Sequence, residues 1–163
     1  MVQFVKTPAI LFTFCKNYGT IQLLDKRVFD EGNRNMFNEI KTSKDIQVFL
    51  EKTNYLHDGY IINVQYTHNG ITKIENGHYF NPTQTKLILQ ILVTSIWDTV
   101  VEIEFESLLE WQIKDNHRDI TDTSVIFDEQ NWIVWSDGVC ISMDEVKKSS
   151  YVIAESMKWR IVE

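Results

Sequence analysis

Histidine and aspartate stand side by side at His57-Asp58, within the stretch YLHDGYIINVQY at residues 55–66. A histidine oriented by a carboxylate is the core of many hydrolytic sites, because the carboxylate accepts the second ring N–H. Adjacent residues of a strand point to opposite faces, so these two side chains would not bond each other in extended backbone. Aspartate also bonds local amides in turns, and Gly59 indicates a special backbone angle. We therefore expect His57 and Asp58 to shape the start of a strand. The alternative is a hydrolase that uses both residues in a cleft.

Three glutamates alternate with apolar residues in the segment VVEIEFES: Glu102, Glu104 and Glu106. The two-residue period predicts a half-buried strand, with carboxylates about 7 Å apart on its polar face. This row is either a solvated outer face or a docking surface for a basic partner. Paired carboxylates could also serve a glycosidase, but glutamates on one open face lack the sugar-sized gap between them that this chemistry needs.

Tryptophan is abundant, with five residues in a chain of 163. We expect most of them in the core, since aromatic residues on strands usually pack. Trp132 and Trp135 fall in one strand pattern, and their odd spacing places them on opposite faces. One of the two is therefore expected to be exposed, where tryptophan often anchors a protein interface. Both join the three glutamates as candidate binding residues.

The sequence contains no pattern typical of a metal, nucleotide or cofactor site. No Cys-x-x-Cys occurs, and no two histidines have the i, i+4 spacing of a helical metal site. The four histidines are scattered, at His57, His68, His78 and His117. The glycine-rich phosphate-binding motifs and the serine nucleophile elbow are absent too. We expect no metal and no cofactor.

The net charge of −7 arises from 23 acidic residues against 16 lysines and arginines. Nucleic-acid binders usually carry a basic face, so we expect no nucleic-acid partner. An acidic surface suits a basic protein partner.

The sequence shows no signal peptide and no apolar run of membrane-spanning length, and Cys15 and Cys140 are typical of reduced buried thiols. We therefore expect a cytoplasmic protein without membrane association.

The clearest helix signal is the segment Ser43–Lys52, where Ser43 can cap the start and Asn54 can end the helix. The rest of the chain mostly alternates in strand after strand, with a weaker helical piece at 143–148 and an early strand at 20–29. We expect one domain over 1–163, with strands and loops over 1–42, a helix over 43–54 and mainly antiparallel strands over 55–163. The fold class is α+β with β dominant. Its antiparallel sheet is open or curls toward a barrel or sandwich, with one main helix packed on it.

The segment FLEKTNYLHDGYIINVQY resembles the opening of a family of small cytoplasmic proteins of Bacillus- and Clostridium-like bacteria. The family's domain has no assigned function. The later segments VVEIEFES, ITDTSVIF, WIVWSDG and MKWRIV are similar as well, so that the resemblance covers residues 48–163. The family's small residue after His-Asp is serine, where this chain has Gly59. The resemblance implies no activity, although some proteins of this general kind resemble immunity proteins, which bind and neutralise toxins.

Taken together, these patterns favour a non-catalytic interaction protein, with an immunity-type inhibitor of a basic protein as its most concrete form. A hydrolase using His57 and Asp58 is the first alternative. A binder of a small apolar ligand inside a curled sheet is the second. The oligomeric state does not follow from the sequence.

Overall fold

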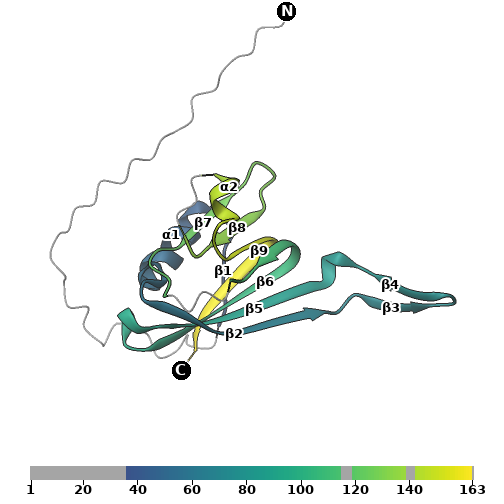
Figure 1. The fold of residues 1–163 in the computed structure, drawn as a ribbon, viewed down its shortest axis with the longest axis horizontal. Coiled ribbons are helices and arrows are strands. Elements are labelled where there is room, and N and C mark those ends of the chain that lie inside the picture. The colour runs from purple at the N-terminus through teal and green to yellow at the C-terminus, as the bar shows by residue number, and fades with distance from the viewer. Residues whose placement is uncertain (1–35, 115–118, 139–141, 163) are drawn as a thin grey trace, which may run out of the picture. The chain divides into compact units, whose positions relative to one another are not determined.

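The structure is a computed structural model that describes residues 36–114, 119–138 and 142–162 (Figure 1). Cys15, Cys140, His117 and the strand expected at 20–29 lie outside the described residues. The strands are β1 Asn38–Glu39, β2 Gly59–His68, β3 Ile71–Ile74, β4 Gly77–Phe80, β5 Thr85–Val93, β6 Thr99–Gln112, β7 Ser124–Phe127, β8 Ile133–Ser136 and β9 Tyr151–Val162. The helices are α1 Ser43–Lys52 and α2 Met143–Val146, and short 3-10 turns are η1 Asn54–Leu56, η2 Pro82–Gln84 and η3 Thr94–Ile96.

Seven strands form one antiparallel sheet in the order β2-β5-β6-β9-β8-β7, with β1 paired to β9. The α+β class with dominant β-structure and one main helix is confirmed. The sheet curls but does not close into a barrel, because its end strands β2 and β7 do not pair with each other. A single bridge between Gly59 and Ile120 spans part of this opening.

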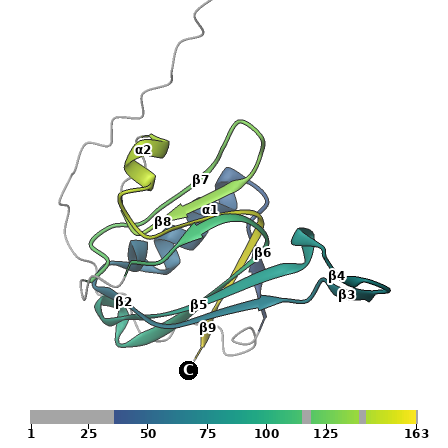
Figure 2. The ribbon, with the colours of Figure 1, turned by 45° about the vertical axis from the view of Figure 1, so that its right-hand side comes forward.

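The curl of the sheet depends on strand β6, which is long and bent. Ser107 has a left-handed φ of 55°, and the pairing of β6 with β9 shifts between Leu108 and Glu110. Such a bulge bends a strand and increases its twist. As a result the second half of β6 folds back over the sheet (Figure 2). Trp111 of that half stacks on Tyr66 of β2, with ring centroids 5.7 Å apart.

Helix α1 packs on the inner face of the curl. Its N-cap is Thr42 and not Ser43, and Asp45 completes a reciprocal capping box with Thr42. The helix buries Ile46 and Phe49, and the Phe49 ring meets Trp159 of β9 edge to face at 5.4 Å. The large side chains of this core that are most fully buried include Phe49, Leu56, Leu87, Phe105 and Trp135.

A second, smaller apolar cluster gathers around the short helix α2. Val146 of α2 packs with Val134, Tyr151 and Ile153 of strands β8 and β9. The weak helical signal at 143–148 is confirmed as this single turn. None of the helices in the described part of the chain combines the length and apolarity needed to cross a lipid bilayer.

Strands β3 and β4 form a separate two-stranded hairpin that projects away from the sheet (Figure 1). The sequence analysis did not predict it, although Asn76-Gly77 between two short alternating stretches is a strong hairpin signal. All eight strand residues of the hairpin are exposed. It lies between the edge strand β2 and its neighbour β5, which it connects.

Candidate protein-interaction site

His57 and Asp58 lie where α1 and η1 lead into β2, and both side chains are about half exposed. His57 Nε2 and the Asp58 carboxylate are 3.8 Å apart, which is too far for a hydrogen bond. The other ring nitrogen, Nδ1, donates to the backbone carbonyl of Thr121 at 2.9 Å. The His57 side chain therefore ties the start of β2 to the segment before β7.

The backbone around this pair is strained. Asn54, Tyr55, Leu56 and Asp58 all have left-handed φ values, between 49° and 56°. Left-handed backbone costs an L-residue about 1–2 kcal/mol, so the surrounding contacts must hold this conformation in place. We call residues 54–58 together with the β5–β6 loop at residues 94–98 the corner.

Four hydrogen bonds join the two halves of the corner. The Asp58 carbonyl accepts from the hydroxyl of Thr94 at 3.0 Å and from its N–H at 3.3 Å. Asn54 donates its side-chain amide to the Ser95 hydroxyl at 3.1 Å, and that hydroxyl donates to the carbonyl of His57. The two loops therefore fix each other in position.

Asp58, and not Gly59, has the left-handed backbone that the sequence led us to expect at the glycine. Gly59 is required for a different reason. A Cβ at this position would lie 2.5 Å from the Leu56 carbonyl oxygen and 3.1 Å from Ile91 Cγ2. Gly59 thus permits close packing of the strand start on the turn before it.

Replacing Gly59 with alanine should lower the free energy of unfolding by about 1–3 kcal/mol, because the backbone oxygen of Leu56 cannot yield as a side chain could. Urea denaturation of the two proteins measures the difference. An unchanged midpoint would show that the turn at Leu56 has room for a methyl group.

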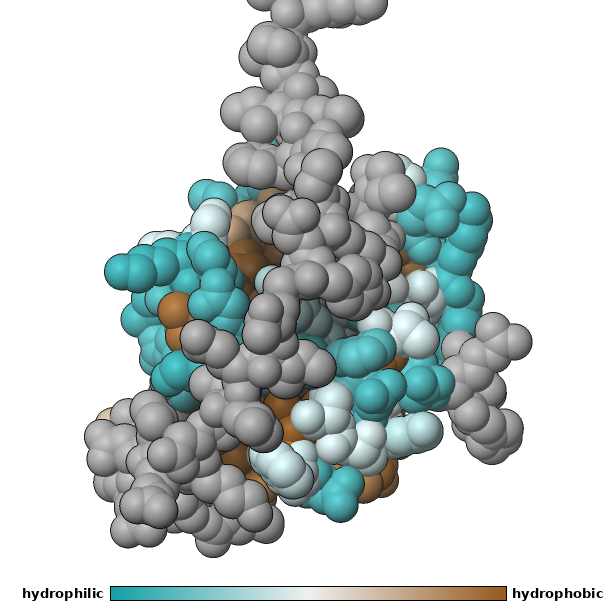
Figure 3. All heavy atoms as spheres, turned by 90° about the vertical axis from the view of Figure 1, so that its left-hand side faces the viewer, coloured by the Kyte–Doolittle hydropathy of each residue, from teal (hydrophilic) through white to brown (hydrophobic). Residues whose placement is uncertain are grey.

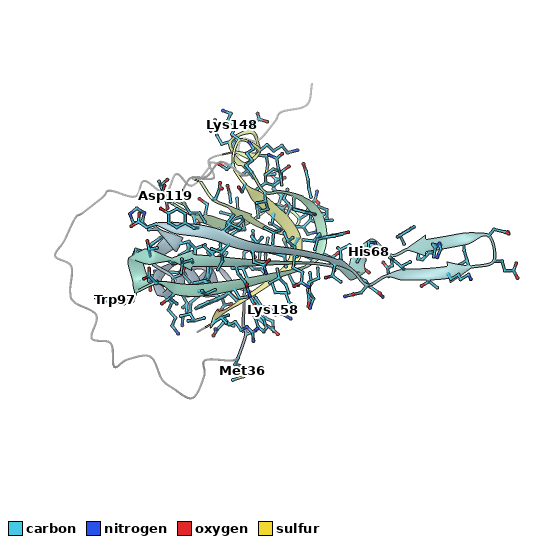
Figure 4. All side chains as sticks on the ribbon, turned by 60° about the horizontal axis from the view of Figure 1, so that its bottom comes forward. Met36, His68, Trp97, Asp119, Lys148 and Lys158 are labelled. Atoms are coloured by element: carbon cyan, nitrogen blue, oxygen red, sulfur yellow. The ribbon has the colours of Figure 1, made fainter. Side chains whose placement is uncertain are left out.

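Trp97 is the most prominent side chain of the corner. It is 72% exposed, the largest exposed fraction among the large hydrophobic residues of the described chain, and its left-handed φ of 66° is followed by 55° at Asp98. Trp97 is not among the binding residues expected from the sequence, because its segment TSIWDT has neither a strand nor a helix period. Figure 4 shows it at the end of the sheet opposite to His68.

Four aspartates lie at this same end of the sheet: Asp58, Asp98, Asp119 and Asp122. No described lysine or arginine forms an ion pair with any of them. Asp119 reaches this end because its neighbour Ile120 bridges to Gly59 (Figure 4). Figure 3 shows the side of the molecule that lies on the left in Figure 1, where hydrophobic patches are bordered by hydrophilic residues.

The glutamate row lies on the outer face of the sheet as predicted, but it is not an open acidic surface. Glu102 and Glu104 are buried, with 7% and 6% of their surface exposed, and only Glu106 is half exposed. The register places cations from the neighbouring strands directly beside them. We expected Glu102, Glu104 and Glu106 to form either a solvated outer face or a free docking surface. The structure shows instead that they form ion pairs with residues of the neighbouring strands.

Glu102 lies at the centre of a rung that crosses four strands. Arg160 of β9 donates to Glu102 Oε1 at 2.6 and 2.8 Å, and Gln90 of β5 donates to Oε2 at 2.8 Å. Asn63 of β2 donates in turn to Gln90 at 3.2 Å. The Phe37 ring lies 4.5 Å from the Arg160 guanidinium. This rung fixes register across the sheet and engages both carboxylate oxygens of Glu102.

Glu104 is bound by two ammonium groups, Lys86 at 2.5 Å and Lys158 at 2.9 Å. Burial alone would raise the pKa of Glu104, but these two lysines outweigh it and hold the pKa below its usual range. Glu106 shares the same lysines at 3.6 and 3.2 Å. The charges of Glu104 and Glu106 are thus balanced within the sheet.

Neither tryptophan expected at the interface is strongly exposed. Trp135 is fully buried against Phe105, and Trp132 is half-buried against the small cluster at α2. Trp132 lies just before β8 and Trp135 lies within it, so the two side chains do not alternate between opposite faces of one strand as we expected. Exposed tryptophan occurs instead at Trp97 and, at 37%, at Trp111.

Glu110 and Tyr151 form a short hydrogen bond of 2.6 Å near the far end of β6. This bond, then burial and the charge of Glu110, raise the pKa of Tyr151 to about 12. Ultraviolet difference titration against Tyr151→Phe should show one tyrosine that ionises last, and Glu110→Gln should move its midpoint toward the ordinary value. An identical midpoint in Glu110→Gln would contradict this assignment.

A groove of about 710 Å³ runs between the start of α1 and strand β9. It presents polar and apolar surface in similar amounts and is lined by Glu39, Ile40, Lys41, Thr42, Ser43, Glu106, Phe127, Asn131, Glu155, Ser156, Met157 and Lys158. Neither His57 nor Trp97 contributes to it. Among the described residues, no group of three His, Cys, Asp or Glu side chains is arranged to hold a metal ion.

No protein-family model matches the chain, and neither a curated protein nor a solved structure matches it.

Proposed function

We propose that this protein is a non-catalytic interaction module that binds another protein through the corner. The observation that carries the proposal is Trp97, an aromatic side chain 72% exposed on a loop held by hydrogen bonds to the neighbouring turn. Tryptophan is the residue type most enriched in interface hot spots. A loop already fixed in one conformation loses little entropy on binding, which favours affinity.

The surroundings of Trp97 favour a basic partner. Asp58, Asp98, Asp119 and Asp122 place negative charge at the same end of the sheet, and the whole chain carries a net charge of −7. Opposite fields accelerate encounter and select partners, mainly through charges at the rim of an interface. An immunity-type protein that neutralises a basic toxin is the most concrete form of this proposal. Its acidic residues are Asp58 and Asp98 of the corner together with Asp119 and Asp122, and not the glutamate row.

The two alternatives receive less support from the geometry. A hydrolase would need His57 and Asp58 in a cleft, whereas both side chains are about half exposed and neither lines the groove beside α1. An apolar ligand inside the curled sheet would need space there. Phe49, Phe105, Trp135 and other core side chains fill that interior.

The proposal can be tested by affinity capture with the immobilised full chain in a lysate of the source organism. We expect a basic protein to be retained at low salt and released at about 0.5 M salt, where surface charges are screened. Trp97→Ala should lose it. Tyr79→Ala, which removes an aromatic side chain that is 58% exposed on the distant hairpin, should retain it.

Circular dichroism should show both variants folded, because both side chains are exposed. Capture of no protein at low salt would contradict the proposal. So would a captured protein that Trp97→Ala retains as well as the wild type does.

A further inference from the structure

Strand β2 is an end strand of the main sheet and is open along most of its length. Its inner edge pairs with β5 from Gly59 to His68. On its outer edge the described chain supplies only one partner, Ile120, which bridges to Gly59. The outward backbone groups from Tyr60 to His68 therefore have no strand beside them within the described residues. Such an edge is a ready template for another strand.

The open edge also exposes large apolar side chains. Those of β2 that are between 40% and 53% exposed are Tyr60, Ile62, Val64 and Tyr66. Native proteins usually protect an edge strand with charges, but the segment GYIINVQYTH contains no lysine, arginine, aspartate or glutamate. A single bulge between Ile61 and Asn63 interrupts it, and pairing is regular from Asn63 to His68.

The β3–β4 hairpin extends this apolar surface beyond the end of the sheet (Figures 1 and 4). Ile71, Ile74, Tyr79 and Phe80 are each between 52% and 58% exposed. A two-stranded hairpin is marginally stable alone in water, and at the root of this one Phe80 meets His68 with ring centroids 5.5 Å apart. Packing on a second molecule would stabilise it.

We propose that β2 pairs antiparallel with β2 of a second copy of this chain, and that each hairpin packs against the partner copy. The proposal concerns a surface separate from the corner and goes beyond the proposed function. An antiparallel pairing of two identical strands is two-fold symmetric, so that every contact is made twice. The result would be one continuous sheet across two molecules.

The exposed area is sufficient for a stable dimer. A fully buried aromatic side chain covers about 150–250 Å² and an aliphatic one less, so the eight half-exposed side chains of β2 and the hairpin, four of them aromatic, together expose on the order of 600–800 Å². This is about what each partner contributes to a standard interface. The backbone bonds of the paired strands would add specificity to this apolar contact.

Charge distribution favours a second copy over a basic partner at this surface. From Tyr60 to Phe80 the only lysine, arginine, aspartate or glutamate residues are Lys73 and Glu75, which are of opposite sign. Two copies with a net charge of −7 repel each other, and they can approach at least cost through a neutral face. A basic partner would instead be drawn to the aspartates of the corner.

Sedimentation velocity of the full chain tests the proposal directly. From about 1 to 200 µM we expect a concentration-dependent shift from the 19.2 kDa monomer to twice that mass. The double variant Ile62→Lys, Val64→Lys should remain monomeric. Pairing of β2 would bury its two lysines beside the same two lysines of the second copy, and like charges repel. Ile126→Lys is the matched control, since Ile126 is 41% exposed on β7, the opposite end strand. It should dimerise as the wild type does.

Hydrogen exchange of the wild type at both concentrations keeps the test decisive if a variant misfolds. The amides of β2 should gain protection in the concentrated sample and lose it on dilution. A wild type that stays monomeric at about 200 µM would overturn the proposal, as would a dimer abolished by Ile126→Lys and not by the double variant. A monomer with β2 amides protected at every dilution would also overturn it, because another segment of the same chain would then cover the edge.

Discussion

Replacing Phe49 with alanine should lower the free energy of unfolding by about 3–5 kcal/mol. Phe49 is fully buried, and its ring meets Trp159 edge to face, so that the substitution removes both the burial and an aromatic contact. This single side chain joins the only long helix of the described chain to the central strand β9. The neighbouring strands cannot collapse into the resulting space without breaking their ladder. Urea denaturation followed by tryptophan fluorescence would measure the loss.

Val48→Ala is the matched control on the same helix. Val48 is 36% exposed, and alanine has the higher helix propensity, so stability should stay within about 0.5 kcal/mol of the wild type. A loss for Phe49→Ala no greater than that of the control would mean that α1 does not complete the core.

Replacing Glu104 with glutamine should cost about 2–4 kcal/mol. The substitution keeps the shape but leaves Lys86 and Lys158 facing a neutral group on a largely buried face. Both lysines are themselves about 30% exposed and can turn partly toward water, so the cost stays below that of a fully buried ion pair. Chemical denaturation at pH 7 measures it.

The effect of Glu104→Gln should shrink as the pH falls. The pKa of Glu104 is lower in the folded protein than its ordinary value of 4.5, so near that pH the unfolded chain binds more protons. The stability that this carboxylate contributes is therefore complete above the unfolded pKa and is lost as the pH falls through the folded one. A difference between the two proteins that stays constant from neutral pH to about pH 3 would contradict this account.

Glu106→Gln serves as the control for the same lysines. Its side chain is 45% exposed and its contacts with Lys86 and Lys158 are longer, so we expect a loss below about 1 kcal/mol. Equal losses at the two positions would show that burial does not distinguish them.

The sequence predicted the elements whose side chains repeat with a clear period. The helix Ser43–Lys52 has the bounds expected from its apolar spacing, and β5 buries Leu87, Leu89, Ile91 and Val93 as the alternation indicates. Strands β7 and β8 pair around a polar turn at residues 129–131 that separates two stretches of strand-forming residues. These features depend on local patterning, which a single sequence carries.

Contacts between segments far apart in the chain could not be predicted in this way. Alternation places Glu104 on the outer face, but only the register of β5 and β9 brings Lys86 and Lys158 beside it. The corner also depends on contacts between distant segments. Hydrogen bonds between its two loops hold the left-handed backbone at Asp58 and Trp97. Neither residue has a periodic pattern around it that would have revealed this.

The central claim is that the corner binds a basic protein partner, and zero-length carbodiimide cross-linking tests it most directly. The reagent joins a carboxylate to a lysine amine in contact with it, with loss of water. In a lysate of the source organism we predict that Asp58 or Asp98 becomes linked to lysines of one basic protein. We also predict that Trp97→Ala abolishes the link. A link that persists in Trp97→Ala, or partner cross-links that occur only at glutamates away from the corner, would contradict the account.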